Sequence, residues 1–490
     1  MTGGRFRRIA AVGIPLLLAL LAALPAGALP TLADLGGDPY ANATSQHATQ
    51  VEPDSFAFGT TIVTAAQTGR FTNGGSSNIC FARSGDSGAT WTSGCLPGIT
   101  VFSSPAGTYN RVSDPAVAYD PKRNVWMISS LALSGTSTVK GAAILTSRSL
   151  DGGLTWQNPV VVATATGTND FDKNWIACDT WATSPYYGNC YTEWDNYGSG
   201  NRLLMSTSTD GGATWGAGLQ TANGASGLGG QPVVRPDGTV VVPSANANET
   251  AIIAFRSTNG GASWSSTTTI TTVKSHSVAG GLRTGPLPSA EVDGAGKVYV
   301  VWQDCRFRKR CATNDIVMST SGDGVTWTSP VRVNIDAVTS TVDHFIPGIA
   351  VDRTTSGATA RLGLAYYFYP AANCSSSTCQ LSVGFVSSKD AGATWSAPTT
   401  LAGPMTTSWI ASTTQGRMVG DYISTSFVGA LAFPVFVVAV APTGGVFAER
   451  MTTVATGISV DVPAAAASGL DVAVVRTGDR PASAAAVSRQ

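Results

Sequence analysis

The sequence predicts an all-β protein with a propeller architecture, on three observations. A short pattern recurs six times and ends each time in a tryptophan, at positions 91, 156, 215, 264, 327 and 395. These tryptophans lie 49 to 68 residues apart, a period that leaves room for four short strands and is typical of propeller blades or repeat arrays. Alternating apolar and polar runs precede the copies, as in half-buried strands. Only 12% of the residues are charged and 55 are glycine, a composition suited to turns and to sheet faces rich in Ser and Thr.

The repeated pattern reads as a tight turn between two strands. In the copy STDGGATW, the Ser and Asp side chains can bond backbone groups of the turn, and glycine supplies a positive φ. The closing Trp is expected to wedge between neighbouring sheets. We therefore interpret the pattern as structural, and not as a ligand contact. The six copies occupy 84–91, 149–156, 208–215, 257–264, 321–327 and 388–395.

Written S-x-D-x-G-x-T-W, this pattern resembles the Asp box, or BNR repeat, of the sialidase-like superfamily, and the resemblance covers nearly the whole mature chain. It implies a sialidase-like β-propeller. A further unit without the pattern follows at 419–424, 431–441 and 446–451, and a segment near Gln46–Val51 would complete it. We therefore favour seven blades, with six as the alternative if the first unit is incomplete. The propeller is expected to span residues 29–460.

The two ends of the chain are expected to lie outside the propeller. Residues 1–28 combine Arg5, Arg7 and Arg8, an apolar run from Ile9 to Leu24 and a small-residue site at 26–28, the layout of a secretory signal peptide. The run is short for a membrane anchor and contains Pro15, so we predict a secreted, extracellular protein. Residues 461–490 form an Ala/Ser-rich tail, predicted to be disordered.

The eight cysteines fall into four close pairs, and an even count in an exported chain predicts disulfides. Zinc binding is the alternative, but no pair has the C-x-x-C spacing and the three histidines lie far apart. No metal or cofactor is therefore expected. The predicted disulfide pairs are Cys80/Cys95, Cys178/Cys190, Cys305/Cys311 and Cys374/Cys379.

The loops on the face opposite the repeated turns are the expected place for chemistry. In a propeller, the segments leading into the first strand of each unit surround the mouth of the central channel, where small-molecule sites form. Bonding to loop backbone is the alternative role for any one of these side chains. Polar residues of these segments are Glu52, Asp114, Asp172, Lys173, Gln231, Asp343, His344, Asp421 and Tyr422, and loops after the second strands add Arg70, Glu193, Asp195, Asp304 and Arg306.

One unit resembles the first catalytic stretch of sialidases. Asp304-Cys305-Arg306 matches the D-x-R element of that family, within a loop that the Cys305/Cys311 bridge would shape. The arginine of the family's R-I-P element has no match; the place falls near Pro286, with Arg283 nearby. The family's nucleophilic Tyr and its Glu partner would correspond to Tyr422 and Glu193. Sialic-acid binding requires three arginines on one carboxylate, and Arg111, Arg283, Arg306 and Arg417 are available.

These features predict a secreted sialidase-like glycoside hydrolase that acts on a glycan or glycoconjugate at the channel mouth. The predicted catalytic residues are Asp304, Glu193, Asp421 and Tyr422. The predicted substrate-binding residues are Arg306, Arg417, Arg111, Asp114, Lys173, Gln231 and His344. The alternative is a non-catalytic propeller that binds glycan or protein on the same face; a lyase that uses His344 and Tyr422 is a third possibility. The precursor is neutral and the mature chain carries a net charge of −3, which gives no electrostatic case for nucleic acid or for a membrane once the signal is removed.

Overall fold

The computed structural model describes residues 1 and 29–460. The predicted signal peptide and the Ala/Ser-rich tail lie outside the described residues. Strands dominate the described part, as predicted, and its helices are short 3-10 turns. None of the described helices is long and apolar enough to cross a membrane. The 3-10 turns are η1 (Tyr197–Ser199), η2 (Lys309–Cys311), η3 (Gly357–Thr359) and η4 (Thr407–Trp409).

Most strands form antiparallel meanders in chain order. The first two meanders are β2 (Gln46–Phe58), β3 (Thr61–Arg70), β4 (Ser76–Ser84) and β5 (Thr92–Cys95), then β6 (Arg111–Asp120), β7 (Val125–Ser134), β8 (Lys140–Ser149) and β9 (Val160–Thr164). The next two are β10 (Phe171–Cys178), β11 (Cys190–Asn196), β12 (Arg202–Ser208) and β13 (Leu219–Gln220), then β14 (Gly227–Leu228), β15 (Val233–Val234), β16 (Val240–Asn246), β17 (Ala251–Ser257) and β18 (Thr268–Thr272).

The remaining strands continue the same arrangement. They are β19 (Ser289–Val292), β20 (Val298–Asp304), β21 (Asp315–Ser321) and β22 (Val331–Arg332), then β23 (Asp343–Val351), β24 (Leu362–Tyr369), β25 (Gln380–Ser388) and β26 (Thr399–Thr406). A short hairpin and a last sheet follow, formed by β27 (Ser412–Thr413), β28 (Gly416–Arg417), β29 (Ser424–Val428), β30 (Leu431–Ala439), β31 (Glu449–Val454) and β32 (Ile458–Ser459).

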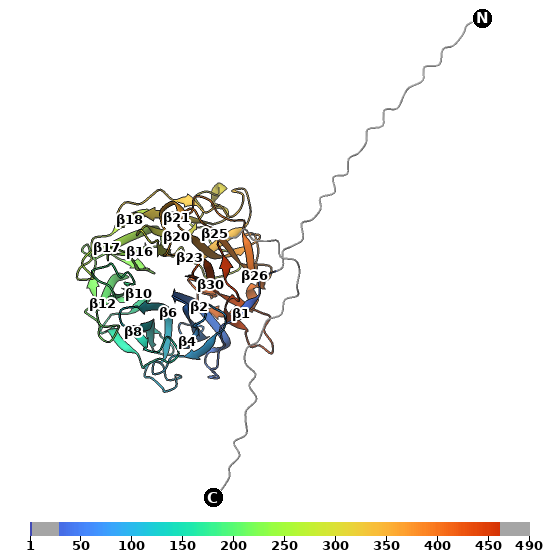
Figure 1. Ribbon diagram of the computed structural model, residues 1–490. Helices are drawn as coiled ribbons and strands as arrows, with labels where there is room; N and C mark the ends of the chain where they lie inside the picture. Colours follow the sequence, from blue (N-terminus) through green and yellow to red (C-terminus); the bar gives the residue numbers. More distant parts are fainter. Residues whose placement is uncertain (2–28, 461–490) are drawn as a thin grey trace.

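Figure 1 shows the meanders arranged in a ring, with β2, β6, β10 and β23 toward the centre and β8, β12, β18 and β26 toward the rim. The all-β fold class is therefore confirmed, and the ring agrees with a propeller. No single sheet closes on itself within the described residues. The count of seven blades stays a prediction.

The two ends of the ring meet in one sheet. Strand β1 (Leu32–Asp34) pairs antiparallel with β31, with Leu32 opposite Val454. The expected closing segment near Gln46–Val51 instead belongs to β2, the inner strand of the first meander. It pairs with β31 only where Thr49 lies opposite Glu449, and the amide of Met451 on β31 also donates to Gln50 Oε1 at 3.0 Å. The prediction missed β1 because a three-residue strand carries almost no periodic signal.

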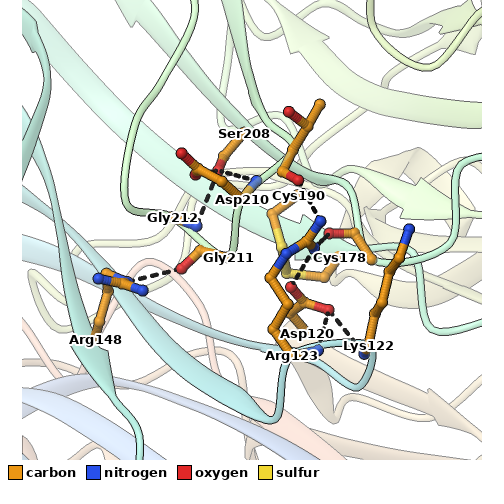
Figure 2. Close-up of a disulfide and its surroundings, with 12 residues drawn as sticks. Asp120, Lys122, Arg123, Arg148, Cys178, Cys190, Ser208, Asp210, Gly211 and Gly212 are labelled. Carbon is orange, nitrogen blue, oxygen red and sulfur yellow. Dashed lines mark hydrogen bonds and ion pairs between the residues drawn. A yellow bond between two sulfur atoms is a disulfide. The ribbon is translucent and has the colours of Figure 1, made fainter.

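The repeated turns hold themselves together as the sequence predicted. In the third copy the amide of Gly212 donates to Ser208 Oγ at 2.9 Å, and the amide of Thr214 donates to Asp210 Oδ1 at 2.9 Å. Arg148, from the neighbouring meander, donates from Nε to the carbonyl of Gly211 at 2.7 Å (Figure 2). This turn therefore forms a contact between adjacent sheets as well as a hairpin.

The tryptophans that close these turns pack between sheets. Trp264 is 4% exposed and its ring lies 6.3 Å from that of Tyr191, on β11 of the preceding meander. Trp156 is also buried and lies 5.5 Å from Phe81, on β4. The wedging role predicted for the closing tryptophan is thus observed for both.

All four predicted disulfides are present, and the described residues contain no free cysteine. Cys80–Cys95 and Cys178–Cys190 join paired positions of neighbouring strands, the latter close to the third repeated turn (Figure 2). Cys305–Cys311 and Cys374–Cys379 tie loops of the opposite face.

Candidate functional site

Bulges in the inner strands place the candidate site. The register shifts at the same point in four of these strands, between Val51 and Asp54, Ser113 and Ala116, Asp172 and Trp175, and Phe345 and Gly348. Each bulge holds a non-glycine residue in the left-handed region, which costs about 1–3 kcal/mol per residue and recurs at functional sites. These residues are Glu52 (φ 53°), Asp114 (φ 50°), Lys173 (φ 48°) and Ile346 (φ 49°).

An ion cluster fills the centre of the mouth. Asp421 accepts hydrogen bonds from Lys173 Nζ and from Arg283, and forms salt bridges with both. Lys173 also lies 3.6 Å from Glu52 Oε1, and Glu52 Oε2 accepts from Gln67. The structure therefore brings together Lys173 and Asp421, two of the predicted site residues, and adds Glu52 and Arg283 to them.

Burial and charge set the protonation states in this cluster. Burial raises the pKa of Glu52 to about 8, with the carboxylates of Asp114 and Asp421 adding to the rise and Lys173 opposing it. Burial would also raise the pKa of Asp421, but Arg283 and Lys173 hold it well below its usual value. The two neighbouring carboxyl groups therefore differ in charge near neutral pH: Glu52 favours its protonated form and Asp421 its ionised form.

A hollow of about 360 Å³ opens above this cluster. Asp172 lies at the wall of the hollow and is partly exposed. Burial of its carboxyl group raises its pKa, although the positive charges of Lys173 and Arg283 oppose the rise. Two buried polar atoms at the hollow, Asp114 Oδ2 and Arg70 Nε, have no hydrogen-bond partner within the described part of the chain. Their hydrogen-bonding capacity is thus unused in the wall of the hollow, although both side chains are buried. Ionisable residues lining the hollow are Glu52, Arg70, Asp114, Asp172, Lys173 and Arg283.

Tyr422 lines a small cavity of about 20 Å³, which shares Asp114 and Lys173 with the mouth hollow and which Asp421 also lines. Its hydroxyl donates to the carbonyl of Pro115 at 3.0 Å, and its ring packs edge-on against Trp175. Burial and the nearby carboxylates of Glu52 and Asp114 raise its pKa well above the usual value. This environment opposes formation of a nucleophilic phenolate.

Glu193 lies within the sheet of β11, fully buried, with neither carboxyl oxygen hydrogen-bonded to a described side chain. Burial and the carboxyl of Asp195 raise its pKa well above the usual value. Asp195 in turn lies opposite Asp172 on β10. Glu193 lies opposite Trp175, whose ring packs on Tyr422, but within the described residues no hydrogen bond joins Glu193 to Tyr422, the partner that the resemblance gave it.

Asp304 and Arg306 form a clamp within their own loop. Arg306 donates to Asp304 through its backbone amide at 2.8 Å and through Nε at 2.9 Å, and its other nitrogens reach Thr271 and Thr272. Asp304 also accepts from the amide of Lys274 and from the indole of Trp302. The D-x-R element therefore shapes this loop, and neither side chain lines the mouth hollow.

The other predicted binding residues are held by framework contacts. Arg111 bonds Asn73 Oδ1 and the carbonyls of Gly74 and Thr136 and stacks on Phe71, beside the hollow. Arg417 donates to the carbonyl of Ile410, and Gln231 Oε1 accepts from the amide of Ala290. The structure does not bring these residues into the ion cluster.

His344 lies apart from the mouth, beside Asp315 and Asp336. These three are the only described side chains that group as potential metal ligands, with their ligand atoms within 4.8 Å of one another. Arg308 and Arg332 form salt bridges with both aspartates, which leaves the group without net negative charge. Burial lowers the pKa of His344 to about 4. The electrostatics favour a structural ion-pair network over a cation site.

Several residues that the structure places at the site were not among the predicted catalytic or substrate-binding residues. Glu52, Arg70 and Asp172 were expected around the mouth from the alignment of the loop segments, but no specific role was predicted for them. Arg283 lies outside the repeating strands and is not part of any matched motif. Glu249 has a left-handed φ of 54°, and its pKa is raised by burial and by the nearby carboxylate of Asp421. No sequence signal marks it.

Comparison with known proteins agrees with the predicted repeat. Residues 140–348 match the family model described as a BNR repeat-like domain, which confirms the resemblance over that part of the chain. None of the curated proteins matches this chain.

Several solved structures are similar at low identity. The leech intramolecular trans-sialidase is 14% identical, with 66% of this chain and 65% of that chain covered and a TM-score of 0.44. This chain thus spans just under two thirds of the leech enzyme. The sialidase of Trypanosoma rangeli is 12% identical over 69% and 56% of the two chains, with a TM-score of 0.45. An α-L-arabinofuranosidase from Fusarium graminearum is 13% identical over 73% and 98%, with a TM-score of 0.44.

Proposed function

We propose that this chain is a secreted glycoside hydrolase that binds its substrate in the mouth hollow. The observation that carries the proposal is the convergence on one hollow of carboxyl and cationic groups from successive inner strands, with Asp114 Oδ2 and Arg70 Nε left unpaired. A hollow with a few convergent polar groups and perturbed pKa values is the expected form of a small-molecule site. Four disulfides support an oxidising, extracellular location.

Asp172 is the best candidate for the general acid. Burial raises its pKa, which is the direction required of a group that donates a proton to the leaving-group oxygen as the glycosidic C–O bond breaks. Asp114, on the adjacent inner strand, supplies the second carboxylate. It either takes the proton of a water that attacks the anomeric carbon, or attacks that carbon itself to form a glycosyl ester that a water then hydrolyses. The first route inverts the anomeric configuration and the second retains it.

The arginines at the hollow favour an uncharged glycoside as the substrate, because they do not form the three-arginine clamp that binds a carboxylated sugar. Arg70 and Arg283 line the hollow, but the guanidinium of Arg111 is used by Asn73, Gly74 and Thr136. Two arginines do not make the three-fold grip on a carboxylate that sialoside binding requires. We therefore rank uncharged glycosides above sialosides as substrates.

A non-catalytic carbohydrate-binding protein is the second candidate. The observation that favours it is the mutual pairing of Lys173, Arg283 and Asp421, since such a network can hold a binding site rigid without taking part in a reaction. This candidate and the hydrolase share the hollow and differ only in turnover.

The test is a screen of the purified mature protein against chromogenic glycosides, including sialosides, followed by Asp172→Asn and Asp114→Asn. We expect turnover by the parent protein and a loss of about 100-fold or more in each variant, with an unchanged Tm. Asp304→Asn is the matched control, because Asp304 bonds its own loop, and folded Asp304→Asn protein should retain activity. Binding without turnover by the parent protein would favour the second candidate. Loss of turnover in Asp304→Asn but not in Asp172→Asn would instead assign catalysis to the D-x-R loop.

A further inference from the structure

A second hollow, also of about 360 Å³, lies at the opposite end of the inner strands. It forms where β2, β23 and β29 end, beside the loop that follows β10. The mouth hollow lies at the beginnings of the inner strands, and the two hollows have no lining residue in common. The second hollow is therefore a separate candidate site, which the proposed reaction does not use.

Aromatic side chains form one part of its wall. Phe58, at the end of β2, is 41% exposed, and Phe427 and Trp181 are partly exposed beside the same hollow. The indole of Trp181 donates to the carbonyl of Val234 at 2.6 Å, which fixes its ring. Large apolar side chains that remain exposed around a concavity are typical of a binding surface.

A fixed ion pair forms the polar part. Arg353 NH2 lies 3.2 Å from Glu291 Oε2, and NH1 donates to Thr180 Oγ1 at 3.1 Å. The guanidinium also lies 5.3 Å from the centre of the Phe56 ring. These contacts hold Arg353 in place, while Arg353 and Glu291 are both about a quarter exposed to solvent. Within the described residues, Glu291 Oε1 takes no hydrogen bond and can accept one from a ligand.

We propose that this second hollow binds a neutral sugar. The apolar C–H face of a pyranose or furanose ring would pack on Phe58 or Phe427, and its neighbouring hydroxyls would bond Glu291 and Arg353. Glu291 balances the charge of Arg353, so the site has no excess positive charge that would favour binding of a carboxylated sugar. The inference goes beyond the proposed hydrolysis, because a sugar held at this end of the channel lies away from Asp114 and Asp172.

The proposal is tested by ligand-observed NMR and calorimetry on the full mature protein. The probes are lactose, cellobiose and arabinobiose, with sialyllactose as the acidic probe, and the variants are Phe58→Ala and Glu291→Gln. At least one neutral disaccharide should bind, and each variant should weaken its affinity about 10-fold, the loss of roughly one aromatic or hydrogen-bonding contact. Because both positions are partly exposed, the variants are expected to fold, which the Tm checks.

Asp114→Asn, at the mouth, separates the two sites. Neutral-sugar binding at the second hollow should persist in Asp114→Asn, and Phe58→Ala should leave any turnover at the mouth unchanged. The proposal is overturned if no neutral disaccharide binds, if neither Phe58→Ala nor Glu291→Gln weakens the binding, or if the binding disappears in Asp114→Asn. Failure of turnover at the mouth would refute the proposed hydrolase and leave this site in place.

Discussion

The ammonium of Lys173 donates a hydrogen bond to the carboxylate of Asp421, a residue 248 positions later in the chain, and both side chains are buried at the centre of the ring. The pair joins the third meander to the segment that leads into the last sheet. It therefore ties distant parts of the chain together at the point where the candidate site lies.

Asp421→Asn should destabilise the protein by about 3–5 kcal/mol, because it leaves the buried cations Lys173 and Arg283 facing a neutral amide. Chemical denaturation measures the change. Asp237→Asn is the control: Asp237 is 55% exposed in its salt bridge with Arg235, so its replacement should change stability by about 0.5 kcal/mol or less. Equal losses of stability in the two variants would contradict the stabilising role assigned to the central ion cluster.

Stability should fall as pH rises from about 4.5 toward 8, owing to Glu52. Its pKa is raised from 4.5 to about 8 by burial, so the folded state retains a proton that the unfolded state has lost across this window. The stabilisation is complete below pH 4.5 and is lost as pH passes 8. Glu52→Gln cannot titrate and should show a flatter Tm profile over the same range. A profile as steep in Glu52→Gln as in the parent protein would assign the dependence to another group, such as Asp54.

Trp264→Ala should cost about 3–5 kcal/mol, because it opens a cavity between two sheets next to Tyr191 and Phe255. Ligand binding at either hollow should be unchanged in the folded variant, since the tryptophan lies at the sheet interface. An unaltered Tm together with lost binding would assign the repeated turn a role in ligand contact.

Non-reducing peptide mapping of the exported protein should find four local disulfides and an amino terminus at Leu29. Replacing both Cys178 and Cys190 by alanine should lower stability by about 2–4 kcal/mol, a typical cost for removing a disulfide. Free thiols in the native protein, or a retained segment 1–28, would argue against the secreted form.

The sequence predicted the parts of the site that depend on repetition. Segments leading into successive inner strands align in the sequence, and this alignment predicts that Asp114, Lys173 and Asp421 lie around one mouth. The approach of Arg283 to Asp421, 138 residues away, depends on tertiary packing of a segment without strand periodicity. The pairing of β1 with β31 escaped prediction for a similar reason. Conversely, the short D-x-R match at Asp304 could not predict which groups surround that side chain. In the structure, Asp304 and Arg306 form hydrogen bonds within their own loop and with the segment at Thr271–Lys274.

The pairing of Leu32–Asp34 with β31 bears on the order in which the protein is made. The residues of β1 are synthesised early, yet their partner, Glu449–Val454, comes more than 400 residues later. The last sheet cannot form until nearly the whole chain has been synthesised and, in a secreted protein, has crossed the membrane. Contacts so distant in sequence form slowly, so ring closure is expected to be a late step of folding, and a chain cut short before β31 would leave β1 without its strand partner.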